Sequence, residues 1–496
     1  MRRATQPAPI REAPPNDSYR SLARSGPILA LFLLALLLRV AALDRSLWVD
    51  ETRTFESTDS WESVVDRHVH VGQGDVHPPL YFALVRLARF LSDDPSFLRA
   101  LFLPFGLVSL LLIHRIGCLR GGHAVGLAAL FLAAASPAHI RYSVELRPYS
   151  LLLLFSSVST YAFFRILSGG GTKDRVLFAA ATALNLYTHL FAAVLYASHA
   201  LFLAIPWAGE RRSVRRDLAA ALLPLLLYLP WLRAALLLAG GRTLRGADGG
   251  GLFGTILFAR AFLETLVGFA GGKLLAFSAT TALLLAGFAR LRRSPRFAPV
   301  IDAATLVLPA ALFTASRPDH HPNMRYFLFL YPYWAVLLGA GAVGIGERLA
   351  RTRLRLRPLL IGAVTLAPVL VLFLPGERPE IWIRSDRWED VRDAIEERLT
   401  STDAVVSAPE SFTVARLLLP IAGPSLAEKL GENRSIAPPY GDPFRKADDA
   451  CERIWAIVVG EGRRSEEIRE TLAPVAAERR DFRMVECRAT LFRIER

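Results

Sequence analysis

The chain has 496 residues, of which 52% are hydrophobic and 21% are charged, and its formal net charge is +14. This much apolar residue argues against a soluble protein of several domains and against intrinsic disorder. The apolar residues also gather in runs of about 20, the length that spans a bilayer. We therefore expect an integral membrane protein, in which the excess of base is first a topology signal and does not by itself indicate nucleic-acid binding.

Residues 1–25 are rich in proline and arginine, and we expect them to form a disordered cytoplasmic tail. The apolar run 26–43 lacks a small-residue cleavage site, so it is interpreted as a retained first span rather than a signal peptide. About eleven transmembrane helices are expected in a domain at 26–375. After the first, they fall at 97–116, 122–139, 148–167, 175–188, 190–208, 217–238, 272–290, 298–315, 325–346 and 358–375.

The charge of the loops predicts how the chain is threaded. Short loops dense in arginine alternate with loops that are longer or poorer in base, which is the positive-inside pattern. This pattern places the N-terminus in the cytoplasm and, with an odd number of spans, the C-terminus outside. The outer segments are then the first outer loop 44–96, followed by 140–147, 188–190, 239–271 and 316–324.

Residues 376–496 differ in composition, with 20 basic and 24 acidic residues. Apolar residues there predict strands alternating with helices, and hence a soluble α/β domain with a small parallel or mixed sheet. By the threading above, this domain is periplasmic or extracellular. Its expected elements are a helix over 385–399, strands at 404–407 and 454–459, and a helix over 465–473.

The first outer loop opens with two adjacent carboxylates, Asp50 and Glu51. Neighbouring side chains on a helix diverge by about 100°, so both cannot point into one cavity. One would serve as a base while the other holds structure. The alternative is a solvated acidic pair beside a membrane helix.

The same loop contains the segment His77-Pro78-Pro79-Leu80-Tyr81. Consecutive prolines fix an extended backbone and prevent a helix at that point, which would hold His77 and Tyr81 in a set geometry. The alternative is a rigid loop corner without chemistry. Between the two motifs, residues 61–65 predict an amphipathic helix at the interface.

A tight connection between two spans carries Tyr142, Glu145, Arg147 and Tyr149. Charged groups are costly so close to lipid unless they are paired or used. The alternative to a functional role is an ion pair of Glu145 with Arg141 or Arg147 inside an aromatic belt.

Two later outer segments add polar groups. His189 lies at a membrane edge, where a histidine is more often structural than a ligand, and Arg325 and Tyr326 begin a span. A guanidinium at a helix mouth suits a phosphate oxygen because it binds in a bidentate way. The adjacent His320 and His321 could bind a metal, although neighbouring histidines rarely share one ion without strain.

The chain has three cysteines. Cys118 is expected at a cytoplasmic membrane edge, and the sequence shows no CxxC pair and no zinc-ligand spacing. Cys451 and Cys487 fall in the exported domain, where a disulfide and two buried thiols are both compatible with the sequence.

The order of these motifs resembles that of family 39-like glycosyltransferases of the GT-C superfamily, which are relatives of protein O-mannosyltransferases and of the lipid A aminoarabinose transferase. The resemblance covers about residues 26–346. It rests on Trp48-x-Asp50-Glu51, His77-Pro-Pro-Leu-Tyr81, Tyr142-Ser-x-Glu145-x-Arg147-x-Tyr149, Tyr187-Thr-His189 and Arg325-Tyr326-Phe327.

The resemblance implies a multi-pass enzyme of the bacterial inner membrane. Such an enzyme transfers a sugar from a polyprenyl-phosphate donor to a lipid, glycan or protein acceptor on the outer face, usually with inversion. Asp50 would be the general base, Glu51 would complete its motif, and Glu145 would orient the acceptor or a metal. The aminoarabinose transferase has a lysine where this chain has His77, and a neutral histidine binds phosphate less well. The residues expected at the substrate are His77, Tyr81, Tyr142, Arg147, Tyr149, His189, Arg325 and Tyr326, with Arg147 and Arg325 on the carrier phosphate.

The resemblance leaves a divalent metal open, because some superfamily members use one and others do not. The sequence has no P-loop, GxGxxG or DxD motif, so no nucleotide site is expected. One alternative is a lipid or polysaccharide transporter of the cell envelope, which would be expected to carry mid-span charges or paired broken helices. Another is an inactive sensor or scaffold whose work is done by residues 376–496.

Overall fold

A computed structural model describes the chain in segments separated by gaps. The described residues are 26–44, 47, 49–68, 77–205, 213–243, 274–291, 324–351, 354–372, 388–398, 403–408, 434–435, 453–459, 468–470, 472–483 and 488–495. Outside them lie the expected tail 1–25, the expected span 298–315, the His320–His321 pair, and Cys451 and Cys487.

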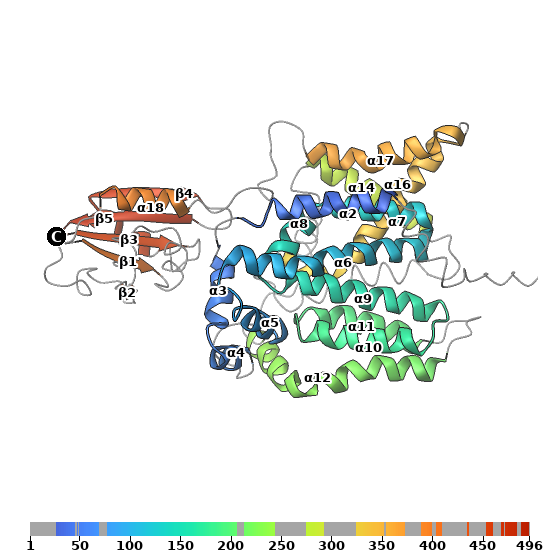
Figure 1. Ribbon diagram of the computed structural model, residues 1–496, viewed down its shortest axis with the longest axis horizontal. Coiled ribbons are helices and arrows are strands. Elements are labelled where there is room, and N and C mark those ends of the chain that lie inside the picture. The colour runs from blue at the N-terminus through green and yellow to red at the C-terminus, as the bar shows by residue number, and fades with distance from the viewer. Residues whose placement is uncertain are drawn as a thin grey trace, which may run out of the picture.

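Residues up to Leu372 form a body of helices, most of which lie side by side (Figure 1). Its elements are α2 Gly26–Val40, α3 Val49–Ser57, α4 Trp61–His68, α5 Leu80–Ala88, α6 Pro95–Gly121, α7 His123–Ala134, α8 Pro137–Val144, α9 Tyr149–Leu167, α10 Thr172–Leu186, α11 Ala192–Ala204, α12 Val214–Thr243, α14 Leu274–Leu291, η2 Met324–Leu330, α16 Tyr331–Leu349, η3 Leu354–Leu356 and α17 Arg357–Leu372.

Several of these helices suit a membrane. Among the described residues, α6, α9 and the stretch Arg325–Leu349 are each long and apolar enough to cross one, and the bent pair α7 and α8 adds a fourth crossing if it counts as one span. Each of the ten expected spans within the described residues contains helix. The total of eleven spans stays a prediction.

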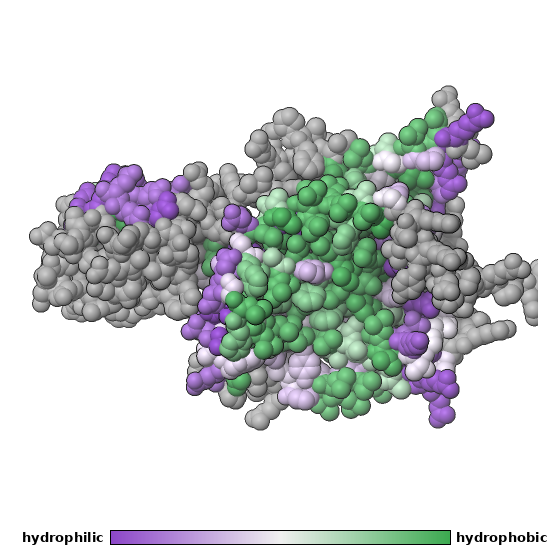
Figure 2. Space-filling view, viewed as in Figure 1, coloured by the Kyte–Doolittle hydropathy of each residue, from purple (hydrophilic) through white to green (hydrophobic). Residues whose placement is uncertain are grey.

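The surface carries the signature of a lipid-facing protein. Figure 2 shows an apolar belt over the helical body, with hydrophilic residues at its two ends. Large apolar side chains in this body are exposed, for example Leu37 of α2 at 67% and Leu226 of α12 at 61%. An apolar surface of this extent is costly in water and is typical of contact with lipid.

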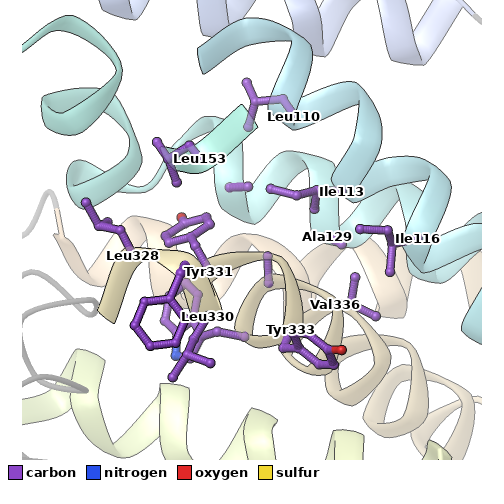
Figure 3. Close-up of a cluster of buried hydrophobic side chains, with 14 of the residues drawn as sticks. Leu110, Ile113, Ile116, Ala129, Leu153, Leu328, Leu330, Tyr331, Tyr333 and Val336 are labelled. Carbon is purple, nitrogen blue, oxygen red and sulfur yellow. The ribbon is translucent and has the colours of Figure 1, made fainter. Parts of the chain in front are cut away.

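The interior of the body is packed by α6, α7, α9 and α16 (Figure 3). Leu110, Ile113 and Ile116 recur at helical spacing on α6 and are fully buried. Gly339 lets α16 approach α7 closely, because a Cβ there would lie 2.7 Å from the backbone nitrogen of Ala129. Backbones this close fix the positions of the helix ends, and the polar residues described below lie at those ends.

The expected span 122–139 is bent instead of continuous, and the expected outer connection 140–147 is helical over its first part. The chain bends by 64° between α7 and α8, and residues 137–144 are helical. Pro137 begins α8 because it has no amide hydrogen to continue α7, while its fixed φ suits a first helical turn. Tyr142 therefore lies buried on helix α8 rather than in a tight connection between two spans.

The segment 44–96, expected as the first outer loop, is largely helical in its described part. α4 confirms the expected amphipathic helix, with Val64 buried and Trp61 43% exposed. α5 begins directly after Pro78 and Pro79, but the backbone of Pro79 is helical, with φ −77° and ψ −18°, and not extended as expected. α6 then starts at Pro95, where the carboxylate of Asp94 caps the helix by accepting from the amide of Phe97.

Beyond α17, the described residues include helix α18 (Trp388–Glu396) and a five-stranded mixed sheet. The strand order is β2-β1-β3-β5-β4; β3 pairs parallel with β1 and antiparallel with β5. Alternate residues of β3 face opposite sides, so that Trp455 and Ile457 pack in the same cluster as α18. The strands are β1 Asp403–Ala408, β2 Arg434–Ser435, β3 Arg453–Val459, β4 Glu478–Arg483 and β5 Arg488–Glu495.

The elements expected at 385–399, 404–407 and 454–459 are found as α18, β1 and β3. β4 and β5 are not predicted from the sequence. For β4 (ERRDFR) the reason is that five of its six residues are charged, so it lacks an apolar pattern. In Figure 1 the sheet lies on the side of the helical body where α3 and α4 lie. The division of the chain at residue 375 stays a prediction.

Candidate functional site

The two adjacent carboxylates of α3 point to different partners, as helix geometry requires. Glu51 is fully buried and accepts from Nη2 of Arg99 at 2.6 Å and from its Nε at 3.1 Å. It also accepts from the amide of Leu146 at 2.8 Å. Glu51 thus ties α3 to α6 and to the segment after α8. A buried pair of this kind makes it costly to remove either partner.

Asp50 instead pairs with Arg325, which lies in the first turn of η2, much later in the chain. Its Oδ2 accepts from Nη1 of Arg325 at 2.6 Å, with the two side chains 14% and 20% exposed. Arg53 lies further away, 3.7 Å from Oδ1, and is 50% exposed. This pairing joins positions 275 residues apart in the chain.

The charges around Asp50 hold it in its ionised form. Burial raises the pKa of its carboxyl, but Arg147, Arg325, Arg53 and His77 act in the opposite direction and together lower the pKa below its ordinary value. A carboxylate among three guanidinium groups is ionised at neutral pH, so it does not have to lose a proton before it can act as a base.

Arg147 is held by the protein on several sides. It is almost fully buried, and its Nη1 donates to the carbonyl of Asp50 at 3.1 Å and to Oγ1 of Thr54 at 3.4 Å. Its Nη2 donates to Nδ1 of His77 at 3.4 Å. Arg147 therefore fixes α3 against the segment before α9 while its charge acts on Asp50.

Aromatic and imidazole rings line the same region. His77 contacts His189 edge to face at 5.2 Å between centroids, and Tyr149 lies 6.2 Å from His189 and 5.0 Å from Tyr142. Nδ1 of His189 accepts from the amide of Phe191 at 3.2 Å, so the neutral ring carries its proton on Nε2.

The ring of Tyr326 extends this group of ring contacts. Its centroid lies 5.6 Å from that of Phe191, and the guanidinium of Arg325 lies 5.6 Å from the centroid of the Tyr326 ring. The start of η2 therefore belongs to the same site as the segments around residues 50, 77, 147 and 189.

Two expected site residues have mainly internal partners. Glu145 is buried and accepts from Nε of Arg141 at 3.3 Å, one of the two ion pairs considered from the sequence. Tyr81 is fully buried between Phe82 and Phe102, at 5.5 and 4.9 Å between centroids. Burial raises the pKa of Tyr81 well above its ordinary value, which keeps this phenol neutral.

Two buried arginines were not anticipated from the sequence. Arg99 pairs with Glu51, and Arg39 donates to the carbonyl of Ala134 at 3.1 Å and to Nδ1 of His139 at 2.8 Å. Arg39 thereby satisfies a carbonyl group at the end of α7, where the chain bends into α8. The available signal was an arginine inside an apolar run, which is rare without a partner.

The carboxylates here do not form a metal-ligand set among the described residues. Asp50, Glu51 and Glu145 each accept from an arginine. In the described part of the chain, the three side chains that gather closely enough to hold a metal ion are two histidines and a cysteine near the opposite end of α6.

One family model and several solved structures are similar to this chain. Residues 76–233 match the family model of dolichyl-phosphate-mannose-protein mannosyltransferase. Among solved structures, the chain is similar to ArnT from Cupriavidus metallidurans bound to undecaprenyl phosphate. The TM-score is 0.56 at 14% identity, over 94% of this chain and 98% of that chain. No curated protein matches the sequence.

Two archaeal structures are also similar. One is the Archaeoglobus fulgidus oligosaccharyltransferase in complex with Zn and sulfate, with a TM-score of 0.54 at 12% identity, over 87% of this chain and 68% of that chain. The other is AglB from the same organism with an inhibitory peptide and a dolichol-phosphate, with a TM-score of 0.51 at 13% identity, over 89% and 70%. The resemblance expected from the motifs is confirmed: the chain is a mostly helical membrane protein that matches this family model over residues 76–233 and shares the fold of these solved structures.

Proposed function

We propose that this chain transfers a sugar from a polyprenyl-phosphate donor to a hydroxyl group of a lipid, glycan or protein acceptor at the outer face of the membrane. The observation that carries the proposal is the pair of Asp50 and Arg325, a base beside a phosphate-binding group. The fold supports it, since similar structures hold undecaprenyl phosphate and dolichol-phosphate.

The reaction needs two complementary charges. The acceptor hydroxyl attacks the anomeric carbon, the bond from that carbon to the phosphate oxygen breaks, and polyprenyl phosphate leaves with the bonding electrons. Asp50 takes the hydroxyl proton, and Arg325 stabilises the negative charge that grows on the phosphate. Attack from the face opposite the phosphate inverts the anomeric configuration.

The ion pair of Asp50 and Arg325 also sets the order of donor binding and base release. Arg325 binds the carboxylate of Asp50 at 2.6 Å in this structure, so the phosphate of an arriving donor competes for that guanidinium. When the phosphate takes over Arg325, Asp50 is released toward the acceptor. A donor-free enzyme thus keeps its base neutralised by an ion pair.

The remaining residues position these two. Glu51 and Arg147 hold α3, and with it Asp50, against α6 and the segment before α9. Tyr142, Tyr149, His189 and Tyr326 offer ring faces of the kind on which sugars pack. Glu145 would orient the acceptor from the end of α8.

The proposal is tested by comparing a deletion strain with strains that carry the wild-type gene. Mass spectrometry of lipid and glycan fractions is expected to reveal one glycosyl unit that disappears on deletion and returns with the gene. Unchanged fractions in the deletion strain, with the polyprenyl-phosphate sugar pool also unchanged, would contradict a transferase.

A further inference from the structure

A histidine, a cysteine and a second histidine meet at the junction of α6 and α7. His114 and Cys118 are four residues apart on α6 and therefore share a helix face. Sγ of Cys118 lies 3.5 Å from Nε2 of His114, and the ring of His123, the first residue of α7, lies 5.6 Å from the ring of His114. One ligand atom from each side chain lies within 4.8 Å of the other two.

Glycines make room for this cluster. Gly122 reverses the chain with φ of 87°, a conformation that side chains with a Cβ rarely adopt. A Cβ on Gly117 of α6 would lie 2.7 Å from Cα of Gly126 of α7, and a Cβ on Gly126 would lie 2.6 Å from Sγ of Cys118. The close approach of the two helices places His123 beside the pair on α6.

We propose that His114, Cys118 and His123 bind a zinc ion. Two imidazoles and a thiolate are donors that zinc prefers, and three protein ligands leave a fourth position for water. In a tetrahedral zinc site the ligand atoms are about 3.3 to 3.8 Å apart, so a small rotation of the side chains closes the present spacing. Binding displaces the thiol proton of Cys118 to solvent.

The surroundings suit such an ion. His114 is buried, Cys118 is half-buried and His123 is exposed, which gives the metal a route from water. Cys118 is a free thiol, and the threading predicts that this end of α6 faces the reducing cytoplasm. The spacing H-x3-C-x4-H matches no common zinc motif, which is why the sequence alone did not indicate a site.

The ion would clamp α6 to α7 far from the transferase site. Arg99 and Cys118 are 19 residues apart on one helix, or roughly 28 Å. The inference does not rest on the proposed function, and its test needs no glycosyl transfer.

The test is metal binding by the purified full-length protein. The chain carries an affinity tag without histidine, is stripped with a chelator and is titrated with Co²⁺ while thiolate-to-cobalt charge-transfer absorption is recorded. We expect one equivalent to give this band and Zn²⁺ to abolish it by competition. The double variant C451S/C487S, which changes the other two cysteines, should keep the band.

Two variants decide the assignment. C118S should lose the band and the rise in Tm that zinc gives the wild type, and H123N, changed at an exposed position, should bind cobalt at least about 10-fold more weakly. No charge-transfer band in the wild type, or an unchanged band in C118S, would overturn the proposal. Unchanged affinity in H123N would overturn the role of the third ligand.

Discussion

Replacing Arg325 by glutamine should shift the acid limb of the pH–activity profile. A general base works only as its ionised carboxylate, so transfer falls as the pH falls through the pKa of Asp50. Burial raises this pKa, but Arg147, Arg325, Arg53 and His77 lower it below the ordinary 3.8. Wild-type transfer should therefore persist to a pH below 3.8 if the protein stays folded.

The shift can be sized from the geometry. Arg325 lies 2.6 Å from Asp50, and both side chains are well shielded, at 20% and 14% exposure. An arginine this close lowers the pKa of an aspartate by about 1 to 3 units. R325Q should therefore raise the midpoint of the acid limb by about 1 to 3 pH units.

Arg53 provides a matched control. It lies 3.7 Å from the same carboxylate but is 50% exposed. Exposed pairs are worth roughly 0.2 to 1 kcal/mol, so R53Q should move the midpoint by less than about 0.7 unit. The assay is kcat/KM against pH in proteoliposomes with a polyprenyl-phosphate donor. A slower R325Q enzyme with an unmoved midpoint would refute the proposed pairing of base and arginine.

Three further predictions concern stability and acceptor choice. E51Q should destabilise the protein by about 3 to 5 kcal/mol because it leaves Arg99 buried without its charge partner. The double variant E51L/R99L removes both charges and should lose less stability. Thermal unfolding measures both variants, and equal losses of stability would contradict the ion pair. G339A should cost about 1 to 3 kcal/mol in the same assay, since its methyl group would lie 2.7 Å from the backbone of Ala129; an unchanged Tm would contradict the close packing. Deleting residues 376–496 should change which acceptors are used, as measured by product mass spectrometry, and unchanged acceptor choice would argue against recognition by this segment.

The sequence predicted the gathering of the site because its residues lie at span ends on one side. Asp50, His77, Arg147, His189 and Arg325 were assigned to the outer face from loop charge alone, and the structure brings them into one network. A helix rising about 1.5 Å per residue leaves little freedom in where the end of a span can lie.

The pairings themselves could not be predicted. Glu51 joins Arg99 across 48 residues, and Asp50 joins Arg325 across 275 residues, and both depend on which helices become neighbours. The bend at Pro137 was missed because the apolar run continues through it, and hydropathy does not record a change of direction.

The measurement that tests the proposed chemistry most directly is transfer by D50N. Removing a general base costs about 10² to 10⁴ in rate, so purified D50N should transfer at least about 100-fold more slowly than the wild type while eluting as a folded protein. D59N is the control, since Asp59 lies in the same segment 44–96 and is 58% exposed, and it should transfer at the wild-type rate. Full activity in D50N would contradict the assignment of Asp50 as the base.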